Sequence, residues 1–82
     1  MNIYLEESVT TTFRVESDDG SRLYVDGILH IDTWYPHGYL GRTAQVNLLK
    51  GYHTLTLEYF EWSGAAAIAF DCDNEDIFIL KS

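Results

Sequence analysis

The sequence predicts an all-β domain, an antiparallel sandwich of about seven to eight short strands in a jelly-roll-like arrangement. Apolar and polar residues alternate with period two over most of the chain, as in strands with one buried face. Turn-forming residues interrupt this alternation at intervals of roughly 8–12 residues, which is typical of sandwiches and barrels. The chain has 82 residues, so we expect a single domain over residues 1–82.

The first half of the chain predicts one strand and a hairpin. The expected strands are residues 9–16, 22–25 and 29–32. A turn is expected over Asp18 to Ser21, where turn-forming residues cluster. Asp26-Gly27 predicts a type I′ hairpin turn, because both central positions of that turn need positive φ. The residues expected to face the core are Leu23, Val25, Leu29 and Ile31.

The second half begins with a long aromatic loop over residues 33–41 and continues as strands. The expected strands are residues 43–49, 53–60, 65–70 and 76–80, with an acidic turn over 71–75. The residues expected to point inward are Ala44, Val46, Leu48, Leu55, Leu57, Tyr59, Ala66, Ile68 and Phe70. The last strand is apolar on both faces, so it must be covered on both sides or pair with another chain.

Charge narrows the classes of partner. Thirteen acidic residues against five basic ones give a net charge of −8. This argues against nucleic acids and anionic membranes, which bind clusters of Lys and Arg. It suits divalent cations, neutral sugars or basic protein surfaces. No apolar run is long enough for a membrane span, and the N-terminus lacks the features of a signal peptide. The single Cys72 excludes an intrachain disulfide and is expected to be a buried thiol, with pairing between chains as the alternative.

An ordered set of motifs points to one family. In order, the motifs are Ser17-Asp18-Asp19-Gly20, Leu23-Tyr24, Asp26-Gly27, Asp32-Thr33-Trp34, Leu48-Leu49-Lys50-Gly51-Tyr52-His53, Glu58-Tyr59-Phe60-Glu61 and Gly64-Ala65-Ala66. Over residues 13–70 the chain resembles the protective-antigen-type domain family. That family is named for the anthrax toxin component and also occurs in yeast flocculins, epithelial adhesins and glycosidases. Its members carry further strands before the equivalent of Val9, so we expect a minimal or truncated version here.

The resemblance implies a β-sandwich that binds carbohydrate and an extracellular or cell-surface, adhesive setting. In sugar-binding members, two adjacent aspartates joined by a cis peptide hold Ca²⁺, and the ion binds sugar hydroxyls. Asp18 and Asp19 match that pair, and Glu61 stands where adhesins carry an Asn ligand. Carbonyls near Ser63 and Ala65 would complete the oxygen shell that Ca²⁺ requires. The alternative for the Asp18-Asp19 pair is a plain turn, which Asp favours by bonding its own backbone.

Aromatic residues supply the candidate sugar contacts. Trp34 is expected in the core. The candidate ligand-binding residues are Tyr35, His37, Tyr39 and Trp62, and their alternative role is packing against a partner chain. His53 opens a strand and is expected to be structural, and a zinc site is not expected because the three histidines lack metal-ligand spacing.

Three non-catalytic functions follow from these residues. An enzyme is not expected, because Asp18 and Asp19 are neighbours in a turn rather than carboxyls facing each other across a cleft. The leading hypothesis is a lectin-like, Ca²⁺-assisted carbohydrate-binding module. The alternatives are a structural or assembly module that forms homo-oligomers by strand pairing, and an acidic inhibitor that docks on a basic protein surface. Partners are therefore a glycan or other protein chains.

Overall fold

A computed structural model describes residues 1–62 and 66–73. These residues form strands and connections, in agreement with the all-β prediction. The strands are β1 (Asn2–Leu5), β2 (Val9–Asp18), β3 (Gly20–Val25), β4 (Ile28–Asp32), β5 (Leu40–Leu48), β6 (Gly51–Phe60) and β7 (Ala67–Cys72). The strand expected over residues 76–80 lies outside the described residues. Within the described part, no helix has the length and hydrophobicity that crossing a bilayer requires.

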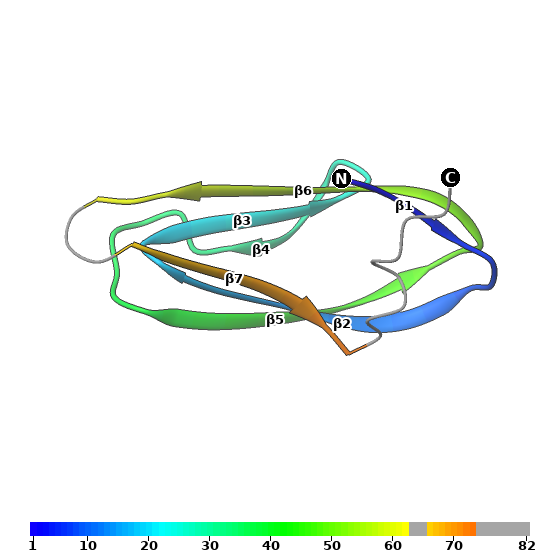
Figure 1. The fold of residues 1–82 in the computed structure, drawn as a ribbon, viewed down its shortest axis with the longest axis horizontal. Helices are drawn as coiled ribbons and strands as arrows, with labels where there is room; N and C mark the ends of the chain where they lie inside the picture. The colour runs from blue at the N-terminus through cyan, green and yellow to red at the C-terminus, as the bar shows by residue number, and fades with distance from the viewer. Residues whose placement is uncertain (63–65, 74–82) are drawn as a thin grey trace.

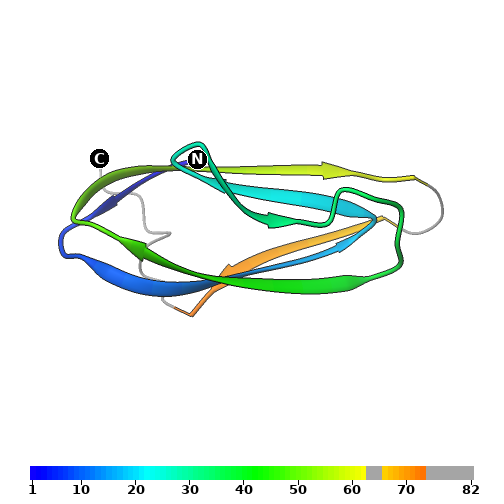
Figure 2. The same ribbon diagram turned by 180° about the vertical axis from the view of Figure 1, so that it is seen from behind.

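The strands form two antiparallel sheets stacked face to face (Figure 1). One sheet has the order β1-β6-β3-β4 and the other β5-β2-β7. Figure 2 shows the same two layers from behind. The predicted sandwich is therefore confirmed.

The core lies between the sheets and follows the predicted alternation in part, because four residues expected to point inward are exposed: Leu29, Leu57, Ala66 and Ile68. Its buried members are Ile3, Leu5, Phe13, Val15, Leu23, Val25, Ile31, Val46, Leu48, Leu55 and Cys72. Phe13 is fully buried, and its ring stacks on Phe70 with centroids 5.8 Å apart. Large aromatics bury roughly 150–250 Å² each, which helps a short chain to form a core. Cys72 is buried, as expected.

The β2–β3 connection differs from the prediction. Instead of a turn over residues 18–21, β2 runs to Asp18 and β3 starts at Gly20, so Asp19 alone separates them. The two strands belong to different sheets. The segment is therefore a corner between the layers, and the Asp18–Asp19 peptide bond in it is cis.

The β3–β4 hairpin confirms one prediction and corrects another. Asp26 and Gly27 both have positive φ, 52° and 80°, as a type I′ turn needs. However, the pairing register shifts between Leu23 and Tyr24. Ile31 stays opposite Leu23 and is buried, whereas Leu29 pairs with Tyr24 and is 43% exposed. The placement of Leu29 in the core was wrong because the irregularity moves it to the outer face.

Other observed strand boundaries also differ from the predicted ones. β1 was not predicted; it adds to the edge of β6 with Ile3 opposite His53. β7 covers Ala67–Cys72 rather than residues 65–70, so the acidic turn does not begin at Asp71. Leu57 lies opposite the buried Leu23 on β3, but it is exposed rather than buried.

Candidate functional site

Three connections meet at one end of the sandwich. They are the β2–β3 corner, the β4–β5 loop of residues 33–39, and Glu61-Trp62 after β6, which lie together at the left of Figure 1 and the right of Figure 2. We call this set of segments the Asp19 end. All of the predicted site residues lie in it: Asp18, Asp19, Tyr35, His37, Tyr39, Glu61 and Trp62.

The Asp19 side chain connects the other two segments. Its Oδ2 accepts a hydrogen bond from the backbone N–H of His37 at 3.1 Å, and its Oδ1 accepts one from the backbone N–H of Trp62 at 3.2 Å. Asp19 is only 4% exposed. One buried carboxylate therefore fixes the positions of both loops that carry the predicted ligand-binding residues.

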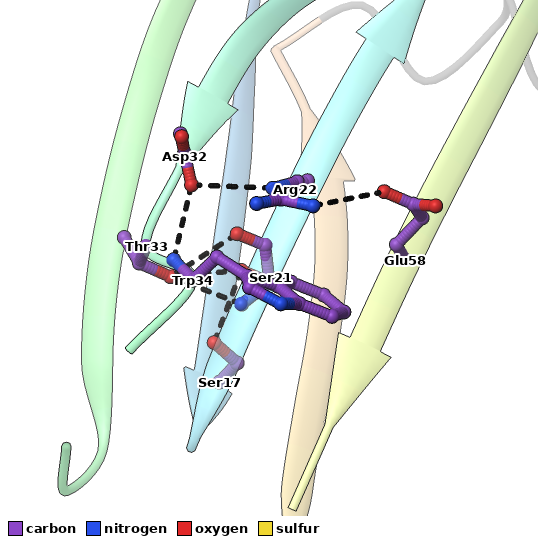
Figure 3. A network of polar contacts seen from close by, with 7 residues as sticks. All are labelled: Ser17, Ser21, Arg22, Asp32, Thr33, Trp34 and Glu58. Atoms are coloured by element: carbon purple, nitrogen blue, oxygen red, sulfur yellow. Dashed lines mark hydrogen bonds and ion pairs between the residues drawn. The ribbon is translucent and has the colours of Figure 1, made fainter. Parts of the chain in front are cut away.

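Hydroxyl groups hold the corner from inside the sandwich. Ser17 Oγ donates to the Asp19 carbonyl at 2.8 Å and lies 3.1 Å from Ser21 Oγ. Thr33 Oγ1 accepts from the Ser21 backbone N–H at 3.1 Å and lies 3.2 Å from Ser21 Oγ. Figure 3 shows these three buried side chains linking β2, β3 and the start of the β4–β5 loop. Buried polar groups are costly unless they are paired, so this network makes one arrangement of the corner preferable to others.

Tyr59 supports the corner from β6. Its hydroxyl donates to the Asp18 carbonyl at 2.5 Å and accepts from the Ala67 backbone N–H at 3.1 Å. The alternation of β6 predicted that Tyr59 points inward, but nothing in the sequence indicated this bridge or the hydroxyl network. Such roles depend on partners 8 and 41 residues away along the chain.

The predicted calcium ligands are only partly brought together. Asp18 and Asp19 are adjacent at the corner, and Glu61 is next to Trp62, whose N–H binds Asp19. Among residues 1–62 and 66–73, no three His, Cys, Asp or Glu side chains are grouped closely enough to hold a metal ion. The carbonyls expected near Ser63 and Ala65 lie outside the described residues.

Trp34 is not a core residue, contrary to prediction. It is 37% exposed and lies on the outer face, where its ring meets that of Phe60 edge-on with centroids 4.7 Å apart. The Arg22 guanidinium lies 4.5 Å from the indole centroid, a cation–π contact. Figure 3 shows Arg22 held between Asp32 and Glu58 over the indole. The prediction failed because these partners on β3 and β6 cover the ring without burying it.

The predicted ligand-binding residues have different surroundings. Tyr35 and Tyr39 are exposed, and Trp62 is 72% exposed. Tyr39 donates a hydrogen bond to the Glu16 carboxylate. This bond raises the pKa of Tyr39 and, together with Arg14, lowers the pKa of Glu16.

His37 is tied into the loop rather than extended into solvent. Its Nδ1 lies 2.5 Å from the Gly38 carbonyl oxygen, which can only accept, so Nδ1 carries a proton. Its Nε2 is buried and has no hydrogen-bond partner among the residues that the structure describes. The Tyr35 ring packs edge-on against the imidazole, with centroids 5.0 Å apart.

Comparisons with known proteins agree with this architecture. Residues 3–75 match the PA14 domain family. The chain is 38% identical over 61 residues to the anti-sigma-I factor RsgI3 of Acetivibrio thermocellus, an alignment that covers 73% of this chain and 10% of that protein. The chain thus spans about a tenth of the length of that relative. No solved structure matches this chain significantly. PA14 domains are often carbohydrate-binding modules and are commonly non-catalytic. By the extent of the family match, the chain belongs to the PA14 domain family.

Proposed function

We propose that this domain is a non-catalytic carbohydrate-binding module and that it binds glycans at the Asp19 end. The observation that carries the proposal is the pair of hydrogen bonds from His37 N–H and Trp62 N–H to the Asp19 carboxylate. They hold two loops that carry exposed aromatic residues beside two acidic residues. Sugar ligands need both kinds of group, because their C–H faces pack on aromatic rings while their hydroxyls bind carboxylates or a metal.

The chemistry of Asp19 fits a bound cation. Buried charges in proteins are usually paired with an opposite charge or bound to a metal. The ion pairs of the described residues involve other carboxylates, and Asp19 receives only backbone N–H groups. Each carboxylate oxygen that accepts one N–H still has a second lone pair. Asp18 and Asp19 would hold Ca²⁺, with Glu61 as the third carboxylate ligand. Bound there, the ion would bind sugar hydroxyls directly.

The exposed rings supply the second half of such a site. Trp62 and Tyr35 present large uncovered surfaces at the Asp19 end. The Trp62 backbone N–H binds Asp19 and the Tyr35 backbone N–H binds the Thr33 carbonyl, so the backbone at both rings has little freedom to lose on binding. The matching relative is an anti-sigma factor, and within a regulator of that kind we expect a domain like this one to recognise a ligand rather than transform it.

Thermal unfolding with and without calcium tests the proposal. We expect millimolar Ca²⁺ to raise the Tm by several degrees over EDTA-treated protein, since a ligand at 100 times its Kd adds about 2.7 kcal/mol. Asp18→Asn should abolish this rise and the glycan-array signal. Asp18 is preferred to Asp19 because substituting Asp19 would also release both loops.

Glu7→Gln is the matched control. Glu7 is exposed in the β1–β2 connection, so the variant loses one negative charge away from the Asp19 end and should respond to Ca²⁺ like the unaltered domain. The absence of both a Ca²⁺-dependent Tm shift and a glycan-array signal in the unaltered domain would overturn the proposal.

One observation favours the assembly alternative. Leu57 and Ile68 lie opposite buried residues of the neighbouring strands, Leu23 and Ser17, yet both are exposed. Exposed apolar side chains beside sheet edges are sites where further strands can pair. A homo-oligomer that covers these positions is therefore our second candidate function.

A further inference from the structure

His53 lies at the start of β6, at the end of the sandwich opposite the Asp19 end. Its side chain is 13% exposed. Nδ1 lies 2.5 Å from Asp26 Oδ2, and Nε2 lies 2.6 Å from the Leu49 carbonyl oxygen. Both ring nitrogens therefore face oxygen atoms at short hydrogen-bonding distance.

These partners determine the protonation state of the ring. An ionised carboxylate and a backbone carbonyl can only accept hydrogen bonds, so each ring nitrogen must donate one. A neutral imidazole has one N–H, and only the imidazolium has two. The Asp26 carboxylate first, and then the Leu49 carbonyl, raise the pKa of His53. In turn His53, and then the Thr54 backbone N–H, lower the pKa of Asp26.

The charged ring connects parts of both sheets. Asp26 is in the β3–β4 turn, where its Oδ1 accepts from Thr54 N–H at 2.8 Å and its own N–H donates to the Thr54 carbonyl at 2.8 Å. Leu49 follows β5, which belongs to the other sheet. One proton on His53 thus links the β3–β4 turn, the β5–β6 connection and β6.

We propose that His53, Asp26 and the Leu49 carbonyl form a pH-operated clamp, closed by the imidazolium and opened when that proton is lost. Loss of the proton leaves one N–H for two acceptors, so the ring releases either Asp26 or Leu49. The elements packed around the ring carry other charged groups, among them the Met1 ammonium, which donates to the Leu55 carbonyl at 2.7 Å, Lys50 and Glu6 in the adjoining connections, and Arg22 and Glu58 further along β3 and β6. Asp26 is the charged group whose field acts on the ring.

The direction of the pH effect follows from the two pKa shifts. The pKa of His53 is raised in the folded domain, so His53 contributes fully to folding stability below the pKa that it has in the unfolded chain. That contribution is lost as pH rises through the folded pKa. The pKa of Asp26 is lowered, so its contribution is present above its unfolded pKa and lost as pH falls through the folded one. The clamp is therefore closed in the pH range that lies above the lowered pKa of Asp26 and below the raised pKa of His53.

Nitrogen-15 NMR of the imidazole rings tests the clamp directly. We expect both His53 nitrogens to be protonated at about pH 6.5, the usual midpoint for histidine, because the pKa of the ring is raised above that value. As the pH rises above about 6.5, the folding equilibrium constant of the unaltered domain should fall. His53→Gln should flatten that fall, because it removes the group whose pKa is raised in the folded domain.

His30→Gln is the matched control. His30 is half-buried on β4, and its replacement should leave both His53 nitrogens protonated at pH 6.5. Asp26→Asn keeps an acceptor oxygen but removes the charge, so His53 should titrate lower in that variant. A His53 ring with one unprotonated nitrogen at pH 6.5 would overturn the proposal, and this NMR readout does not depend on whether the variants fold.

Discussion

Gly20 sets the spacing of the corner between the two sheets. A Cβ atom at this position would lie 2.1 Å from Cε1 of Phe60 and 2.7 Å from the Thr33 carbonyl oxygen. Neither Gly20 nor its neighbours need positive φ, so the requirement is for space and not for backbone freedom. The sequence suggested a turn glycine here, whereas packing is the reason for it.

We expect Gly20→Ala to destabilise the domain by about 1–3 kcal/mol, the usual cost of overpacking. The Phe60 ring would have to move away from residue 20, and the Thr33 backbone would have to shift. Chemical denaturation measures the change in free energy of unfolding. Gly38→Ala is the control, since nothing lies within 4 Å of the added atom, and an equal loss in both variants would contradict this explanation.

At the scale of elements, the register of β4 decides which of its side chains are buried. Alternation alone places Leu29 and Ile31 on the same face, as residues two apart in a strand. The shift between Leu23 and Tyr24 separates them, so Ile31 is 3% exposed while Leu29 faces solvent. Sequence patterns do not indicate such irregularities, because they arise from the fit of one strand to its neighbour.

Paired alanine substitutions measure this register. Ile31→Ala should cost about 2–5 kcal/mol, because it leaves a cavity in the core. Leu29→Ala should cost no more than about 0.5 kcal/mol, the usual range for surface positions. The free energies of unfolding from urea titration compare the two. Equal costs would mean that β4 pairs with β3 in the regular register after all.

At the scale of the whole molecule, the two sheets do not cover each other completely. Leu57 on β6 and Ile68 on β7 are both exposed on strand faces that elsewhere form the core. Among the strands that the structure describes, β7 lies at the edge of its sheet. This arrangement motivates the assembly alternative.

Light scattering at micromolar concentration tests that alternative. If the domain assembles through these positions, it should be a dimer or larger, and Ile68→Glu should shift it to a monomer by placing a charge in the apolar contact. Glu7→Gln should leave the assembly intact. A monomer at all concentrations would rule out this candidate and leave the carbohydrate proposal unaffected.

The sequence was informative about features that depend on near neighbours in the chain. Alternation predicted most of the strands and the core positions of Phe13, Leu23 and Leu55. Asp26-Gly27 predicted the hairpin turn. The ordered motifs from Ser17 to Gly64 indicated the family, which the match over residues 3–75 confirms. These signals are local because period-two burial and turn φ angles are properties of short segments.

Only the tertiary structure decided how distant residues meet. The sandwich places Asp18 and Asp19 beside loops about 18 and 43 residues away along the chain, puts Trp34 on the outer face and makes His53 a charged link between sheets. Each of these depends on which strands become neighbours and in what register, and that is settled by packing the two sheets together. The all-β architecture could therefore be predicted from the sequence. The chemistry of the Asp19 end and of the opposite end, where His53 lies, arises from contacts that only the folded chain creates.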